Sequence, residues 1–163
     1  MSDSLTTTDV QGDEADTSVD LGPQDNQAGE DTLSGTDGED TLVSDEGNDD
    51  LTGGDGNDTL EGGGNDALGA GSGDVTLVGG TGDDVFHVSA MGNFVVQDFG
   101  AEHDKLHFDA QATGLHDLGD LLAHVTAIEQ THVGVIVHFG DTGSITLVGL
   151  SLGNLSVHIA EVS

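Results

Sequence analysis

The stretch GGDGNDTLEGGGNDALG, residues 53–69, decides the fold of this chain. It gives nearly the same glycine- and aspartate-rich phrase twice, and each copy closes on a leucine, Leu60 or Leu68. Glycine permits the left-handed backbone angles that a very tight turn requires. Leucine supplies an apolar side chain for a core. Each copy is therefore predicted to form one short strand and one tight turn.

The same phrase recurs on both sides of this stretch. Aligned on Gly-x-Asp, seven units follow one another at a spacing of nine residues, with a single spacing of eight. Repetition at a fixed period predicts stacked copies of one structural unit. The units begin at Gly29, Gly38, Gly47, Gly56, Gly64, Gly73 and Gly82. They close on Leu33, Leu42, Leu51, Leu60, Leu68, Leu77 and Phe86.

Nine residues suffice for half of one coil. Thr59-Leu60-Glu61 can form a strand whose middle side chain points inward while its neighbours point outward. Two units then complete one coil, and stacked coils form two small parallel sheets with the leucines between them. Because strands lie about 4.8 Å apart, the turns of alternate units stack on the same edge.

This arrangement stacks the aspartates too. Carboxylates about 5 Å apart repel by about 1 kcal/mol per pair even in water. A cation between successive turns would replace this repulsion with ligation. Calcium suits such a site because it accepts about six to eight oxygens and combines carboxylates with main-chain carbonyls, whereas magnesium requires tighter octahedral geometry. We expect one edge to carry Asp31, Asp49, Asp66 and Asp84, and the other Asp40 and Asp58, then Val75 in place of an aspartate.

The phrase GGDGNDTLE (53–61) resembles the calcium-binding nonapeptide of RTX proteins, Gly-Gly-x-Gly-x-Asp-x-(apolar)-x. The resemblance covers residues 29–90 and implies an all-β parallel β-roll that binds about three to five calcium ions. The implied side-chain ligands are Asp31, Asp40, Asp49, Asp58, Asp66 and Asp84. The implied main-chain ligands are carbonyls around Gly38, Gly47, Gly53, Asp55, Gly56, Asn57, Gly62, Gly64, Gly80 and Gly82.

The repeat departs from the family pattern in several units. Thr36 and Ser44 stand where glycine is usual, and Val75 replaces an aspartate that Asp74 could substitute with poorer geometry. We therefore expect well-formed sites around Asp40 and Asp58 and along the Asp31 edge, and weaker ones near Asp84. Three acidic residues that precede turn glycines are expected to point to solvent: Asp37, Glu46 and Asp55.

The flanking segments differ from the repeats. Residues 1–28 are acidic and show no period, which indicates a disordered leader. Residues 91–163 predict a small β-rich cap with strands over 93–99, 104–108, 133–139, 144–150 and 155–162, and one helix over 114–129. Residues 85–110 resemble the segment that caps the last RTX repeat. Residues 134–163 resemble the uncleaved C-terminal region that type I secretion machinery reads.

Charge and composition exclude several classes of function. Acidic residues number 32 against a single Lys or Arg, Lys105, and the net charge is −31. Nucleic acid is therefore excluded as a partner, because phosphate binding needs basic residues. The chain has no cysteine, and its N-terminus has no pattern of a signal peptide. No window reaches the roughly 18 apolar residues of a transmembrane segment.

The sequence contains no catalytic constellation. There is no His-Glu-x-x-His and no Gly-x-Ser-x-Gly among its residues. Two pairs of its eight histidines, His103 with His107 and His116 with His124, have spacings that invite a metal site. Their segments make surface histidines the default interpretation. We therefore expect a protein that is not an enzyme.

The leading hypothesis is a secreted, extracellular bacterial protein that binds calcium, leaves through a type I system and folds on meeting calcium outside. One alternative is an adhesin or matrix protein that bridges surfaces through calcium. Another is a polysaccharide-binding accessory module. With only Lys105 available to meet an anionic polysaccharide, that contact too would require calcium bridging.

Overall fold

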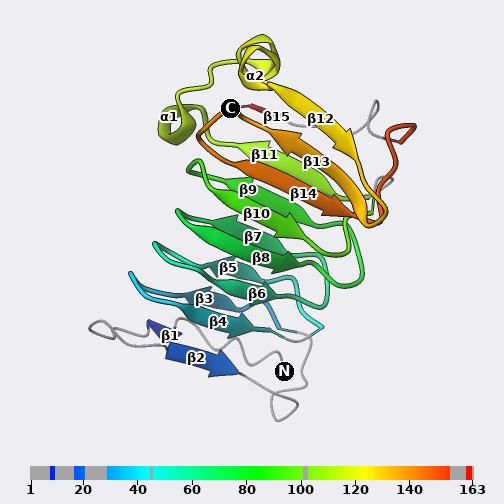
Figure 1. Ribbon diagram of the computed structural model, residues 1–163. Coiled ribbons are helices and arrows are strands. Elements are labelled where there is room, and N and C mark those ends of the chain that lie inside the picture. Colours follow the sequence, from blue (N-terminus) through cyan, green and yellow to red (C-terminus); the bar gives the residue numbers. More distant parts are fainter. Residues whose placement is uncertain are drawn as a thin grey trace.

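The chain winds back and forth between two sheets that face each other across a narrow core (Figure 1). The computed structural model describes residues 8–9, 17–20, 29–44, 46–100, 103–154 and 161–162. Sheet A contains β1 (Thr8–Asp9), β3 (Thr32–Ser34), β5 (Asp50–Thr52), β7 (Ala67–Ala70), β9 (Val85–Val88), β11 (Lys105–Phe108) and β15 (Glu161–Val162). Sheet B contains β2 (Thr17–Asp20), β4 (Asp40–Val43), β6 (Thr59–Glu61), β8 (Asp74–Val78), β10 (Asn93–Val96), β14 (Ser144–Val148), β13 (Gly134–His138) and β12 (Ala127–Gln130).

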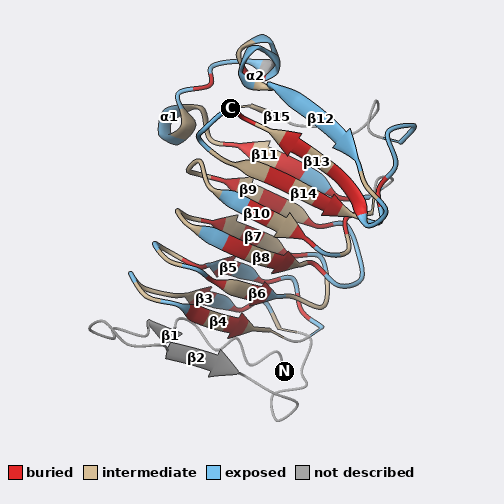
Figure 2. Cartoon of the chain, viewed as in Figure 1, coloured by how far each residue is buried: buried red, intermediate tan, exposed pale blue. Residues whose placement is uncertain are grey.

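The repeat strands pair in parallel with their leucines in register. Leu51 lies between Leu33 and Leu68 in sheet A, and Leu60 lies between Leu42 and Leu77 in sheet B. Each of these side chains is at most 2% exposed. Figure 2 shows buried residues in red along the repeat strands. Burying such a side chain contributes about 1.5–3 kcal/mol. The predicted parallel β-solenoid is confirmed. Its later strands β7, β8 and β9 each bury two apolar residues in place of the one that was predicted.

The unit that is one residue short does not disturb the register. Leu51 still pairs with Leu68, and Leu60 with Leu77. The missing residue falls in the turn between β6 and β7, where the chain makes no ladder. A deletion within a strand would shift the strand by one residue and turn its leucine outward. A deletion in the turn leaves both flanking strands in register, so it is tolerated.

The coil continues beyond the last repeat. Phe94 of β10 pairs with Val75, and Leu106 of β11 pairs with Phe86, so both predicted strands extend the two sheets. The antiparallel hairpin of β13 and β14 then lies on β10, and β12 follows at the end of sheet B. Sheet B therefore ends in antiparallel strands, whereas sheet A remains parallel up to β15.

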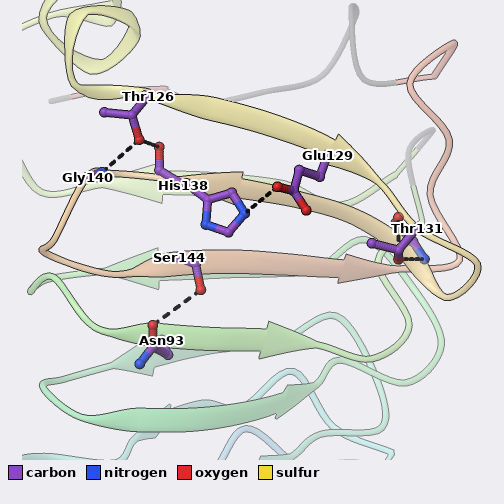
Figure 3. Close-up of polar contacts among 8 residues, drawn as sticks. Asn93, Thr126, Glu129, Thr131, His138, Gly140 and Ser144 are labelled. Carbon is purple, nitrogen blue, oxygen red and sulfur yellow. Dashed lines mark hydrogen bonds and ion pairs between the residues drawn. The ribbon is translucent and has the colours of Figure 1, made fainter.

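Polar contacts tie this cap together (Figure 3). Ser144 donates its hydroxyl to Asn93 Oδ1 at 3.2 Å, which joins the hairpin to the roll. The backbone N–H of Gly140 donates to Thr126 Oγ1 at 3.0 Å. His138 Nε2 lies 3.9 Å from Glu129 Oε1 across the β12–β13 pair.

The helix predicted over residues 114–129 is wrong in its extent. The structure has a four-residue helix, α1 (Ala110–Thr113), and a seven-residue helix, α2 (Leu118–His124). Helix α2 begins after Asp117, whose side chain accepts the N–H of Asp120. It ends because Val125 is extended and the N–H of Thr126 bonds to the carbonyl of His138. Residues 127–129, predicted as helix, belong to β12.

Two predictions concern segments that are described only in part. Strands β1 and β2 lie within residues 1–28, where no strand was predicted, and they pair with β3 and β4. The rest of that segment, and residues 155–160 of the strand predicted over 155–162, lie outside the described residues. Neither helix of the described chain is long and apolar enough to span a membrane.

Candidate metal sites in the turns

The buried aspartates form two stacks along the edges of the solenoid. We name the edges by direction: edge AB holds the turns from sheet A to sheet B, and edge BA holds the turns from sheet B to sheet A. The structure places all six predicted side-chain ligands in these stacks, each at most 8% exposed. Edge BA carries Asp31, Asp49, Asp66 and Asp84, and edge AB carries Asp40 and Asp58.

One carboxylate oxygen of these aspartates binds the turn one coil below. On edge BA, the backbone N–H of Asp31 donates to Asp49 Oδ1 at 2.8 Å, and that of Asp49 donates to Asp66 Oδ1 at 2.9 Å. On edge AB, the N–H of Asp40 donates to Asp58 Oδ1 at 3.0 Å. The carboxylates therefore lie between successive turns, where an inter-turn cation would need its ligands.

Edge BA also holds two acidic residues that the sequence analysis missed. The N–H of Asp84 donates to Asp104 Oδ1 at 3.1 Å, and Asp104 is 5% exposed. Asp98 accepts the N–H groups of Gly79 and Gly80 at 3.0 and 2.7 Å. Asp104 lies two residues before the buried Leu106, which is the Asp-x-Leu spacing of the repeats. This spacing is the feature of the sequence from which Asp104 could have been predicted. The region of Asp84, expected to be weak, is thus rich in carboxylates.

On edge AB, buried apolar side chains follow the two aspartates. Val75, Phe94 and Ile145 continue the stack above Asp58, and each is at most 2% exposed. Asp74 does not fill the place of Val75, because its side chain is exposed and accepts Asn93 Nδ2 at 2.8 Å. The acidic part of edge AB is therefore short, and an apolar stack replaces it.

The second carboxylate oxygens fall into two groups. Oδ2 of Asp40, Asp66 and Asp104 accepts backbone N–H groups of its own turn. Oδ2 of Asp49 and Oδ2 of Asp58 are buried and have no hydrogen-bond partner among the described residues. A Cβ added to Gly53 would lie 2.4 Å from Asp58 Oδ2, and one added to Gly62 would lie 2.1 Å from Asp66 Oδ2. Glycine at these positions keeps side-chain atoms away from the carboxylates.

Main-chain carbonyls stack beside the carboxylates. A Cβ on Gly56 would lie 1.9 Å from the carbonyl oxygen of Gly38, and one on Gly64 would lie 1.6 Å from that of Gly47. The carbonyls of Gly53, Gly56, Gly62 and Gly64 likewise face the α-carbons of Gly35, Gly73, Gly80 and Gly82. Carboxylate and carbonyl oxygens together are the hard donor set that calcium prefers. The residues present fit this ion.

The remaining acidic turn residues point away from the stacks. The side chains of Asp37, Glu46 and Asp55 are exposed, as expected. Asn57 is exposed too and donates weakly to Glu39 at 3.4 Å, so of Asp55 and Asn57 only main-chain atoms could be ligands. Within the described ranges, no group of three or more histidine, aspartate and glutamate side chains converges on one point. A calcium ion in these turns would need carbonyls to complete its shell.

Burial makes the ionised aspartates costly. It raises the pKa of Asp49, Asp58 and Asp104, and it raises the pKa of Asp84 to about 6. For Asp84, the negative charges of Asp104, Asp66 and Asp98 add to this effect, while the N–H of Asp66 opposes it. At neutral pH the turns therefore hold carboxylates that would release free energy on meeting a positive ion.

Comparison with known families agrees with this geometry. Residues 25–60 and 62–90 match the RTX calcium-binding nonapeptide repeat in four copies. No curated protein matches the chain significantly. The resemblance noted from the sequence is confirmed: the chain contains RTX repeats, which bind calcium, and in this structure they form a β-solenoid.

Proposed function

We propose, from the premise that the chain carries RTX calcium-binding repeats, that it is an extracellular bacterial protein whose roll folds when calcium enters its turns. The observation that carries the proposal is the pair of buried aspartate stacks, in which Oδ2 of Asp49 and Oδ2 of Asp58 have no hydrogen-bond partner within the described ranges. Without a cation, burial of these second oxygens costs free energy that no hydrogen bond compensates.

The turns would hold calcium through residues from two successive coils. On edge BA, Asp49, Asp66, Asp84 and Asp104 supply carboxylates, with Asp31 at the open end. On edge AB, Asp40 and Asp58 supply them, and the glycine carbonyls complete the shell. The bound ion neutralises the stacked charges and links neighbouring turns. Because these sites require the coil, the free energy of calcium binding becomes free energy of folding.

This coupling suits a protein that must cross an export channel unfolded. The net charge of −31 and the buried carboxylates oppose compaction where calcium is scarce. Outside the cell, calcium would close the roll. In the folded state residues 134–148 form the cap hairpin, so a type I exporter would have to read the 134–163 region before folding. The RTX repeats have a structural role in this proposal, and no catalytic step is assigned to the chain.

Calcium binding is tested by isothermal titration of chelator-treated protein at neutral pH. We expect about three to five ions per chain, bound cooperatively. Binding of a single ion, or none, would overturn the assignment of the stacks.

Export is tested separately in a bacterial host that carries a type I exporter. The full chain is expected in the medium, and a chain ending at residue 133 is expected to remain in the cells. Equal export of both chains would overturn the role of residues 134–163 and leave calcium binding intact.

A further inference from the structure

We propose that His87 and His107 bind a transition-metal cation, of which Zn²⁺ is the probe, on the outer face of sheet A. The two residues lie on the adjacent parallel strands β9 and β11 and are directly paired in register. Phe86 and Leu106 beside them point into the core, so the imidazoles lie on the opposite face of the sheet. This face is separate from both edges that carry the aspartate stacks.

The two rings already present nitrogens at a chelating distance. Nδ1 of His87 lies 3.1 Å from Nδ1 of His107, and the ring centroids are 4.8 Å apart. Zinc binds histidine nitrogen at about 2.0–2.1 Å, so two ligands of a tetrahedral ion lie about 3.4 Å apart. The observed separation, now spanned by a hydrogen bond between the rings, is within a few tenths of an ångström of that value.

The surroundings favour a cation on neutral imidazoles. Both rings are half-buried, and burial together with the charge of His107 lowers the pKa of His87. The neutral ring is the form that binds metal. The carboxylates of Asp50 and Asp109 act electrostatically on His87, and that of Asp109 acts on His107 as well. Their negative charge would partly compensate that of a divalent ion.

The pairing of strands sets the row of residues to which the two histidines belong. Glu161 of β15 pairs with His107, so the row across sheet A runs from His87 through His107 to Glu161. Among the described side chains no third ligating group joins the two histidines. Water is therefore assigned the remaining positions of the ion. This site uses imidazole nitrogens, which suit zinc, copper and nickel, whereas the aspartate turns use hard oxygens.

The histidine pairs noted in the sequence, His103 with His107 and His116 with His124, are not the pair that the structure brings together. His103 Nδ1 instead lies 2.9 Å from Asp83 Oδ1, and His124 Nδ1 contacts the carbonyl of Asp120. His87 and His107 are 20 positions apart, one coil of the roll, and only the parallel pairing of β9 with β11 brings them together.

The test titrates Zn²⁺ into the full chain at saturating calcium, which keeps the roll folded and its carboxylates occupied. Long-range ¹H–¹⁵N correlations report the ring nitrogens of all eight histidines. We expect the first equivalent of Zn²⁺ to shift the Nδ1 signals of His87 and His107 and to leave the other histidines unchanged. Equal shifts over all histidines, or none at these two, would overturn the proposal without the use of any variant.

Substitutions give a second, independent readout. H87Q and H107Q should each weaken Zn²⁺ binding by about tenfold or more, while the exposed control H116Q should not. Calcium-induced circular dichroism confirms that each variant folds. A folded H87Q chain with undiminished affinity would contradict the proposal.

Discussion

At the scale of the single residue, the two carboxylate oxygens of Asp58 have different tasks. In Asp58, Oδ1 accepts the N–H of Asp40 and so fixes the turn one coil below, while Oδ2 is buried without a hydrogen-bond partner among the described residues. The first oxygen builds the stack, and the second keeps a site available within it. Burial raises the pKa of this carboxyl, so the arrangement is costly until a cation arrives.

Asp58→Asn tests this division of tasks. Asparagine keeps the size of the side chain and one carbonyl oxygen but loses the charge that a cation would meet. The calcium concentration at the folding midpoint should rise by about tenfold or more. The matched control is Asp37→Asn, which removes an equal charge from an exposed side chain on the same edge. Equal midpoints for both variants would show that only net charge matters.

Gly56→Ala tests the close stacking of turns. Gly56 has a φ of +153°, and its Cβ would lie 1.9 Å from the carbonyl oxygen of Gly38. The variant should lose about 1–3 kcal/mol of unfolding free energy at saturating calcium, measured by urea denaturation. Gly69→Ala is the control, because its Cβ would lie 3.3 Å from the flexible hydroxyl of Thr52. Similar losses for both variants would argue against the tight turn stack.

At the level of strands and helices, the repeats were predictable and the cap less so. A short strand such as β6 follows from one leucine flanked by glycine turns, because no other unit fits nine residues. The interval 114–129 was wrongly predicted as one long helix. Its residues Leu121, Val125 and Ile128 have helical spacing, although the segment forms a short helix followed by a strand. Its end is decided by the pairing of β12 with β13, a contact distant in sequence.

The candidate site, too, was predictable where it follows the repeat and not where it depends on contacts distant in sequence. Its six repeated aspartates could be located from the period alone, since the register is fixed by the leucines. Asp104 could not be located from the period, because the turn that leads to it is longer than the repeat turns. The His87–His107 pair was hidden for a related reason: it depends on which strands become neighbours.

Asp104→Asn tests whether the acidic stack extends into the cap. If Asp84 and Asp104 share an ion, calorimetry should show one calcium fewer per chain, or a clearly weaker last site. Asp141→Asn, an exposed residue of the cap with the same charge change, should leave the titration unchanged. An Asp104→Asn chain that binds calcium like the unmodified protein would confine the sites to the repeats.

For the whole molecule, charge sets the dependence of folding on pH. Four buried carboxyls, those of Asp49, Asp58, Asp84 and Asp104, have raised pKa values in the folded state, so folding takes up protons. In calcium-depleted buffer their contribution is full below about pH 4 and is lost as the pH rises through about 6, the pKa of Asp84. His87, with a lowered pKa, acts in the opposite sense but is a single group.

Calcium-free protein should therefore gain structure between pH 7 and about pH 4.5, measured by far-ultraviolet circular dichroism. Asp84→Asn should reduce this dependence, because it removes the carboxyl whose pKa is raised to about 6. Calcium-free stability that increases with pH over this range would contradict the account of the buried carboxyls.

The central claim is that calcium, by entering the aspartate stacks, drives the chain to fold. Far-ultraviolet circular dichroism during calcium titration of chelator-treated protein at neutral pH tests it most directly, with magnesium as the control ion. The account predicts a cooperative change from coil to β-structure with calcium and little change with magnesium. A spectrum that is already β-rich without calcium, or that remains coil at millimolar calcium, would contradict it.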